Sequence, residues 1–279
     1  MFNPRLLATA LLAVFSFTAA AAQPIRALLI TGGCCHEYGK QKDVLKNGLE
    51  SRINIIVDQI HTDDKSTKPP LEILGKADYA KGYDIVIHDE CGSDISEPAT
   101  VEAVLKPHRD GLPGVNLHCA MHSYRIGNPN EAVKELGTPH GYWFEYLGIQ
   151  SSAHGPQEPI AITFTNKQNA IVRGLEDWTT VREELYNNVK VFDSATPLAG
   201  GKQIVKTRSG EERTVEHVVA WINQYGPKKT RVFSTTIGHN TATVEDARYV
   251  DLVSRGVLWA TGHLKEDGAP AEGYAQQVK

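Results

Sequence analysis

Six of the eleven histidines in this sequence lie at or just after short apolar runs that predict buried strands. They are His36, His61, His88, His118, His122 and His239. Imidazole changes its charge near neutral pH, and it also binds metal ions and sugar hydroxyl groups. In an open parallel sheet the carboxyl ends of the strands meet at one edge, where ligands bind. The spacing therefore predicts an imidazole-rich site at that edge, although His61 opens a polar loop and is expected to be solvated.

Some of these positions also allow metal binding or a purely structural role. His118 and His122 are four residues apart, so they would share a face if the turn between them continued as a helix, and such a pair suits a metal. Asp89 and Glu90 follow a predicted strand and could complete a metal site or pair with a histidine. His88, at the end of that strand, fits a buried core residue equally well. A divalent metal therefore stays an alternative; no cofactor is expected and no metal ligand is assigned.

The first half of the chain alternates between predicted strands and helices that would position these histidines. Apolar, β-branched runs predict strands at residues 25–31, 53–60, 83–88 and 114–117. Helical spacing predicts helices at residues 39–52 and 97–109, the second limited by Pro107. This alternation favours right-handed βαβ units and a parallel sheet flanked by helices.

The second half is less regular. A helix is predicted at residues 129–137, and short strands at residues 159–165 and 189–192. A turn at 224–227 is expected to join strands at 216–223 and 230–236. The clearest helix spans 249–260, with Thr243 and Asp246 spaced as a capping box. No long linker divides the chain, so one α/β domain with a doubly wound, mostly parallel sheet is predicted.

The N-terminus predicts export. Arg5 precedes an apolar run at residues 6–19, and the small residues 20–22 fit cleavage before Gln23. We expect a signal peptide at 1–22 and a single domain at 23–279 in the periplasm or outside the cell; an uncleaved anchor is the alternative. An oxidising compartment permits disulfides, but the sequence leaves open how its four cysteines pair.

Charge and motifs exclude several classes of partner. The net charge is −4, and lysines and arginines are scattered, so neither nucleic acid nor an acidic membrane surface is expected as a partner. The turn at residues 32–35 lacks the G-x-G-x-x-G pattern, so no dinucleotide cofactor is predicted. A small molecule is the expected partner, and the oligomeric state stays open.

Five short motifs occur in an order and spacing that resemble a known family. They are Gly32-Gly33-x-x-His36, Val115-Asn116-Leu117-His118-Cys119-Ala120, Glu184-Leu185-Tyr186, Arg231-Val232-Phe233-x-x-x-Ile237-Gly238-His239 and Gly256-Val257-Leu258-Trp259-Ala260. Together they resemble the ThuA-like (trehalose utilisation) branch of the class I glutamine amidotransferase-like superfamily, over roughly residues 25–263. The resemblance implies a flavodoxin-like doubly wound sheet and a role in sugar catabolism.

The resemblance also implies where a catalytic pair would stand. The superfamily has a cysteine nucleophile on the sharp turn after a central strand and a histidine base after a late strand. His239 matches the base, whereas the turn position falls on His118 or, with a one-residue shift, on Cys119. The glutaminase signature is missing at residues 116–120 and 239–241, so a glutaminase is not expected. We take His118 and His239 as the predicted catalytic residues.

Other residues are predicted to bind the substrate: Gly33, His36, Cys119, His122, Tyr142, His154 and Glu184. The expected function is an enzyme that isomerises, enolises or eliminates on a keto-sugar or disaccharide, because imidazoles suit proton transfer beside a carbonyl group. The alternatives are a non-catalytic sugar-binding or accessory protein, and a metal-dependent hydrolase built on His36, His118 and His122.

Overall fold

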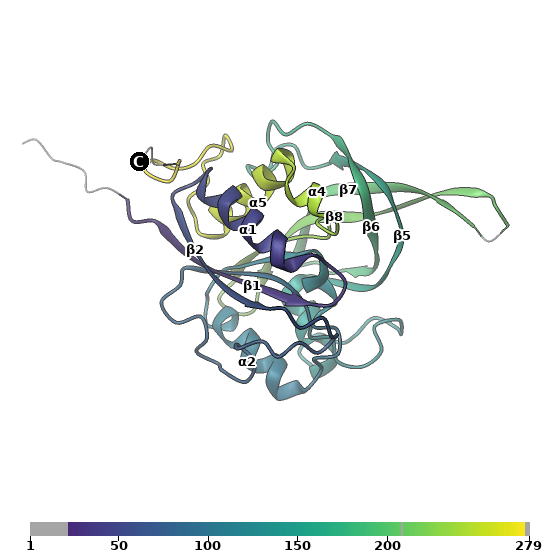
Figure 1. Cartoon of the computed structure of the whole chain (residues 1–279), viewed down its shortest axis with the longest axis horizontal. Coiled ribbons are helices and arrows are strands. Elements are labelled where there is room, and N and C mark those ends of the chain that lie inside the picture. The colour runs from purple at the N-terminus through teal and green to yellow at the C-terminus, as the bar shows by residue number, and fades with distance from the viewer. Residues whose placement is uncertain (1–21, 208, 277–279) are drawn as a thin grey trace, which may run out of the picture.

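In the computed structural model, residues 22–207 and 209–276 are described, and they contain one nine-stranded sheet. Its strands are β1 (Ile25–Gly33), β2 (Ile55–Thr62), β3 (Ile85–Cys91), β4 (Gly114–Leu117), β5 (Ile149–Phe164), β6 (Trp178–Val191), β7 (Ala195–Lys206), β8 (Glu212–Tyr225) and β9 (Thr230–Thr235). They are arranged in the order β2-β1-β3-β4-β9-β8-β7-β5-β6. Figure 1 shows β2 and β6, the first and last of this order, on opposite sides of the molecule. The predicted signal peptide, apart from Ala22, lies outside the described residues.

The first five strands of this order are parallel and carry helices on both faces. Helices α1 (Tyr38–Glu50) and α5 (Ala247–Ala260) pack on one face, and α2 (Pro98–Arg109) and α3 (Tyr142–Leu147) pack on the other (Figure 1). β1 is apolar on both faces, since Leu29 packs towards α1 and Leu28 towards α2. The α/β class is thus confirmed, and this part has the expected βαβ construction. None of the helices in the described ranges is long and apolar enough to cross a membrane.

The expectation of a mostly parallel sheet is wrong for the remaining strands. β9, β8, β7, β5 and β6 pair antiparallel, so the sheet is mixed (Figure 1). Short turns join β7 to β8 and β8 to β9, and a two-strand connection of that length can only be antiparallel. The antiparallel half matters for function because β6 carries acidic and aromatic side chains to the edge where the parallel strands end.

Three local predictions are corrected. Residues 129–137 form turns, not a helix; Val133 and Leu136 are 50% and 37% exposed, so no packed face supports so short a helix. The histidine turn after β4 is a 3-10 helix, η1 (His118–His122). The predicted capping box is replaced by two caps: Asn240 caps the short helix α4 (Thr241–Val244), and Asp246 caps α5.

A buried polar chain lies on the α2 face of the sheet. His88 Nδ1 contacts Glu90 Oε1 at 2.7 Å, and His88 Nε2 contacts His108 Nε2 at 3.1 Å. His108 Nδ1 donates to the Leu112 carbonyl at 2.8 Å, so a neutral His108 accepts at Nε2 and His88 donates. Tyr124 also donates to Glu90. His88 is therefore a fully buried core residue tied to α2.

We expect acid to destabilise the fold partly through His108. Burial and the neighbouring His88 lower the pKa of His108 to about 3, so the native ring stays neutral. In the unfolded chain the ring takes up a proton below pH ~6.5. The contribution of neutral His108 to the free energy of unfolding is therefore complete above pH ~6.5. It is lost as the pH falls towards 3, by at most about 1.4 kcal/mol per pH unit.

Urea unfolding at several pH values, for the wild type and His108→Asn, checks this prediction. The variant should be less stable at neutral pH and should lose less stability on acidification. An equal acid-induced loss in both proteins would contradict the role given to His108.

Candidate functional site

Three of the six histidines meet at the carboxyl edge of the parallel strands. His36 follows β1, His118 follows β4 and His239 follows β9. The ring centroids lie 4.6 Å apart for His36 and His118, 4.8 Å for His36 and His239, and 5.4 Å for His118 and His239. We call these three side chains the histidine cluster. Far-separated segments of the chain thus bring their imidazoles into direct contact.

Tight backbone turns bring the first two rings to this edge. Gly33 has a φ of 100°, and a Cβ there would lie 2.2 Å from the Cys91 carbonyl oxygen, so only glycine fits between β1 and β3. At the next turn it is His118 that has a left-handed φ, of 41°, whereas Cys119 does not. His118 therefore occupies the sharp-turn position, which the sequence left open between these two residues.

Glu184 on β6 lies among the imidazoles. Its carboxylate oxygens are 3.5 Å from His118 Nε2, 3.4 Å from His239 Nδ1 and 3.6 Å from His154 Nε2. Burial raises the pKa of Glu184, but the hydrogen bond and charge of His118, with the charges of His154 and His239, outweigh it and hold the pKa at about 2. The side chain is therefore a carboxylate at neutral pH.

The environment favours the neutral form of two imidazoles of the cluster, those of His36 and His239. Burial, and then the nearby His118 and His239, lower the pKa of His36 to about 2. Burial and His118 also lower the pKa of His239. His118 Nδ1 lies 2.7 Å from the Thr236 carbonyl oxygen, which can only accept, so this nitrogen carries the proton and Nε2 faces Glu184. Neutral His36 and His239 thus each have a ring nitrogen with a lone pair, near the Glu184 carboxylate.

The loop that carries His239 is fixed by a second carboxylate. Glu183 is fully buried and accepts hydrogen bonds from the backbone N–H groups of Gly238, His239 and Asn240 at 3.3, 2.9 and 2.9 Å. On the other side, Gln41 of α1 donates to the His239 carbonyl. Adjacent strand residues point to opposite faces, so Glu183 holds the loop whereas Glu184 faces the imidazoles.

Tyr186, two residues after Glu184, lies beside the cluster. Its ring stacks on His122 with centroids 4.0 Å apart, and its hydroxyl lies 3.3 Å from His118 Nε2. His122 is buried and bonds to Ser151 through Nε2. The predicted pairing of His118 and His122 on one helical face does not form, because a 3-10 helix has three residues per turn and residues four apart do not share a face.

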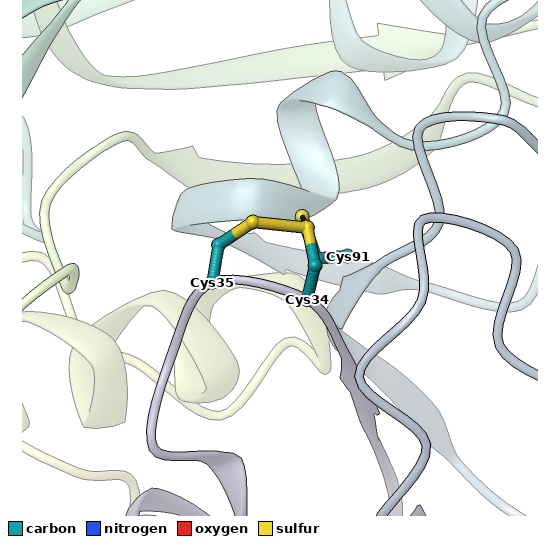
Figure 2. A group of neighbouring side chains, drawn as sticks. All are labelled: Cys34, Cys35 and Cys91. Carbon is teal, nitrogen blue, oxygen red and sulfur yellow. Dashed lines mark hydrogen bonds between the residues drawn. A yellow bond between two sulfur atoms is a disulfide. The ribbon is translucent and has the colours of Figure 1, made fainter.

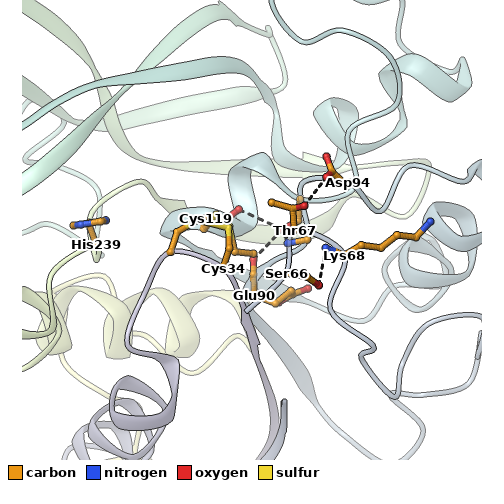
Figure 3. The surroundings of a disulfide bond; sticks show 12 residues. Cys34, Ser66, Thr67, Lys68, Glu90, Asp94, Cys119 and His239 are labelled. Atoms are coloured by element: carbon orange, nitrogen blue, oxygen red, sulfur yellow. Dashed lines mark hydrogen bonds between the residues drawn. A yellow bond between two sulfur atoms is a disulfide. The ribbon is translucent and has the colours of Figure 1, made fainter. Parts of the chain in front are cut away.

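All four cysteines are paired within the described part of the chain, next to the histidine cluster. Cys34 bonds to Cys35, and the sulfurs of Cys34 and Cys91 are 3.6 Å apart (Figure 2). Cys91 in turn bonds to Cys119. Figure 3 shows Cys34 and Cys119 together, with His239 on the side away from Ser66 and Thr67. Because Cys119 is in a disulfide, it is not a free thiol here, and thiolate attack from this turn has no support.

A polar cavity of about 320 Å³ opens beside His36. Its lining includes Gly33, Tyr38, His61, Lys40 and Lys65. His61 therefore lies near the site but outside the cluster, bonded to Thr31 and Asp63. This cavity gives a small polar molecule a place to lie against the imidazole of His36.

The remaining predicted residues divide into those near the cluster and one that is not. His154 is partly exposed and reaches Glu184. Tyr142 packs against Arg109, whose Cζ lies 4.8 Å from the centroid of the Tyr142 ring, and is not brought to the cluster.

The sequence missed the role of Glu183, because adjacent glutamates on a strand are usually exposed and nothing local marks one as buried.

Comparison with known proteins agrees with this architecture. The model of the ThuA family, described as trehalose utilisation, matches residues 26–260. A ThuA-like protein of Parabacteroides merdae is 20% identical with a TM-score of 0.60, covering 91% of this chain and 97% of its own. One from Bacteroides uniformis is 15% identical with a TM-score of 0.56, covering 88% and 95%. None of the curated proteins matches the sequence. Since the family model spans most of the sequence, the chain belongs to the ThuA (trehalose utilisation) family.

Proposed function

We propose that this protein is an exported enzyme that transfers a proton next to the carbonyl group of a keto-sugar or keto-disaccharide. Membership of the ThuA family implies a role in carbohydrate metabolism. The observation that carries the proposal is the position of the Glu184 carboxylate, within 3.6 Å of three imidazoles at the sheet edge. Export is proposed from the N-terminal sequence alone.

Enolisation, isomerisation and elimination all need one group that takes a proton from carbon and another that gives a proton to oxygen. His118 and His239 are the proposed acid/base pair, and Glu184 stabilises the positive charge that an imidazole gains when it takes the proton. Gly33, His36 and His154 are proposed to contact the sugar. Cys119 is buried in a disulfide and His122 is buried against Ser151, so we propose that they hold the turn beside the cluster. Tyr142 lies outside the cluster and is not proposed to contact the reacting group.

The proposal is tested by incubating the protein with a keto-disaccharide, trehalose in which one hydroxyl group is oxidised to a ketone, and following the reaction by NMR. We expect a new product from the keto-disaccharide, and turnover reduced at least about tenfold by His118→Ala and by His239→Ala. His263→Ala removes an imidazole that stacks on Tyr274 and takes no part in the cluster or the cavity, so this control should keep wild-type turnover. Full turnover in both cluster variants would refute the acid/base assignment. Calorimetric binding of the keto-sugar without product would favour the non-catalytic alternative.

A further inference from the structure

The histidine cluster has unused donor atoms that face one another. One ring nitrogen from each of His36, His118 and His239 lies within 4.8 Å of the other two. The Nδ1 atom of His36 is buried and makes no hydrogen bond to any described residue, and that of His239 has only the Glu184 carboxylate beside it, at 3.4 Å. A buried polar atom without a partner costs about 1–3 kcal/mol, so the unpartnered nitrogen of His36, beside two further imidazoles, points to a missing ligand.

We infer that the histidine cluster binds a divalent transition metal ion of the zinc class, with His36, His118 and His239 as ligands. Imidazole nitrogen is a preferred ligand of Zn²⁺ and of its neighbours Co²⁺, Ni²⁺ and Cu²⁺. Three protein ligands leave one coordination position for water or substrate, as in catalytic zinc sites. The Glu184 carboxylate, already beside two of the rings, adds the negative charge that favours a cation.

The surroundings fix the ligands as metal sites require. The Thr236 carbonyl accepts from His118 Nδ1–H, so Nε2, which lies 3.3 Å from the Tyr186 hydroxyl, is the nitrogen that would bind a metal. Glu183 and Gln41 hold the backbone of His239 from opposite sides. Partners of this kind orient imidazole ligands and strengthen metal binding.

The nearby sulfurs do not compete for this role. Cys91 and Cys119 lie close enough to His36 to form another candidate ligand group. They are joined to each other, and Cys34 is joined to Cys35, so no thiolate is available while the disulfides are intact. The inferred site therefore uses three nitrogen ligands, with the Glu184 carboxylate beside them.

Metal binding can be tested without any substrate and does not depend on the proposed function. Only the use of the metal in the reaction rests on that function. A bound divalent ion polarises a carbonyl oxygen. His118 and His239 would then hold the ion, and Glu184 would be the remaining group able to move a proton. The reaction would still be proton transfer beside a carbonyl group, but His118 and His239 would bind the metal and no longer act as acid and base.

Titration of chelator-treated, non-reduced protein with Co²⁺ tests the inference without any substrate. We expect one ion per chain, visible d–d absorption of low-symmetry Co²⁺, and displacement by Zn²⁺. His36→Ala, His36→Gln and His239→Ala should each weaken binding at least about 100-fold, because loss of a ligand exceeds the effect of losing its supporting partner. His61→Ala is the matched control and should bind as the wild type does. Circular dichroism shows whether each variant is folded.

Other outcomes would overturn the inference. Absence of stoichiometric binding, equal affinity in the folded cluster variants, or a thiolate-to-cobalt charge-transfer band would each do so. Turnover of the keto-sugar by metal-free protein would leave the proposed function intact and remove the metal from it. Metal binding without turnover would leave the site intact and refute the proposed reaction.

Discussion

Glu184→Gln should reduce turnover of the keto-disaccharide by about 10²- to 10⁴-fold, the usual range for loss of a positioned acid–base group. The side chain lies within hydrogen-bond or ion-pair distance of three imidazoles, and Gln157 also donates to it. Glutamine keeps its size but removes the negative charge. Whether Glu184 stabilises a protonated imidazole or moves the proton beside a metal, the charge is what the reaction uses.

Steady-state kinetics on the folded variant measure this effect. The loss should fall mainly on kcat, because the charge stabilises the transition state more than it binds the ground state. Glu216→Gln on β8, a carboxylate paired with Lys202 near the surface, serves as the control and should leave kcat unchanged. A Glu184→Gln enzyme with near-normal kcat would exclude Glu184 from the chemistry.

The sequence predicted the parallel half of the sheet well because its signals are local. Continuous apolar runs such as β1 mark strands buried on both faces, and the turns after them carry the histidines. Because these strands are apolar on both faces, their sequences do not indicate which face of the sheet a given side chain points to. His88 ends a predicted strand just as His118 follows one, yet it points to the α2 face and pairs with His108. Only the packed sheet separates a core histidine from a site histidine.

The antiparallel half was less predictable because tertiary pairing overrides local signals there. β5 runs from Ile149 to Phe164, although Gly155 and Pro156 within it favour turns. Register shifts against β6 accommodate these residues. The sequence therefore predicted only the end of this strand, and the position of β6 against the imidazoles could not be inferred from spacing.

Glu183→Gln should destabilise the protein by about 2–4 kcal/mol, an effect that its neighbour Glu184→Gln should not share. Both carboxylate oxygens of Glu183 accept backbone N–H groups from the loop at residues 238–240. An amide has one acceptor oxygen, so its NH₂ group would face at least one N–H donor in a buried site.

Chemical denaturation of the two variants under the same conditions makes the comparison. Glu183→Gln should unfold at lower denaturant and should also lose turnover, because the loop it holds carries His239. Glu184→Gln should lose less stability, because glutamine can still accept from Gln157 and leaves no backbone N–H of the loop without a partner. If the two variants were equally stable, Glu183 would not be the anchor of this loop, and the fixed position of His239, on which both the proton-transfer and the metal proposals depend, would need another cause.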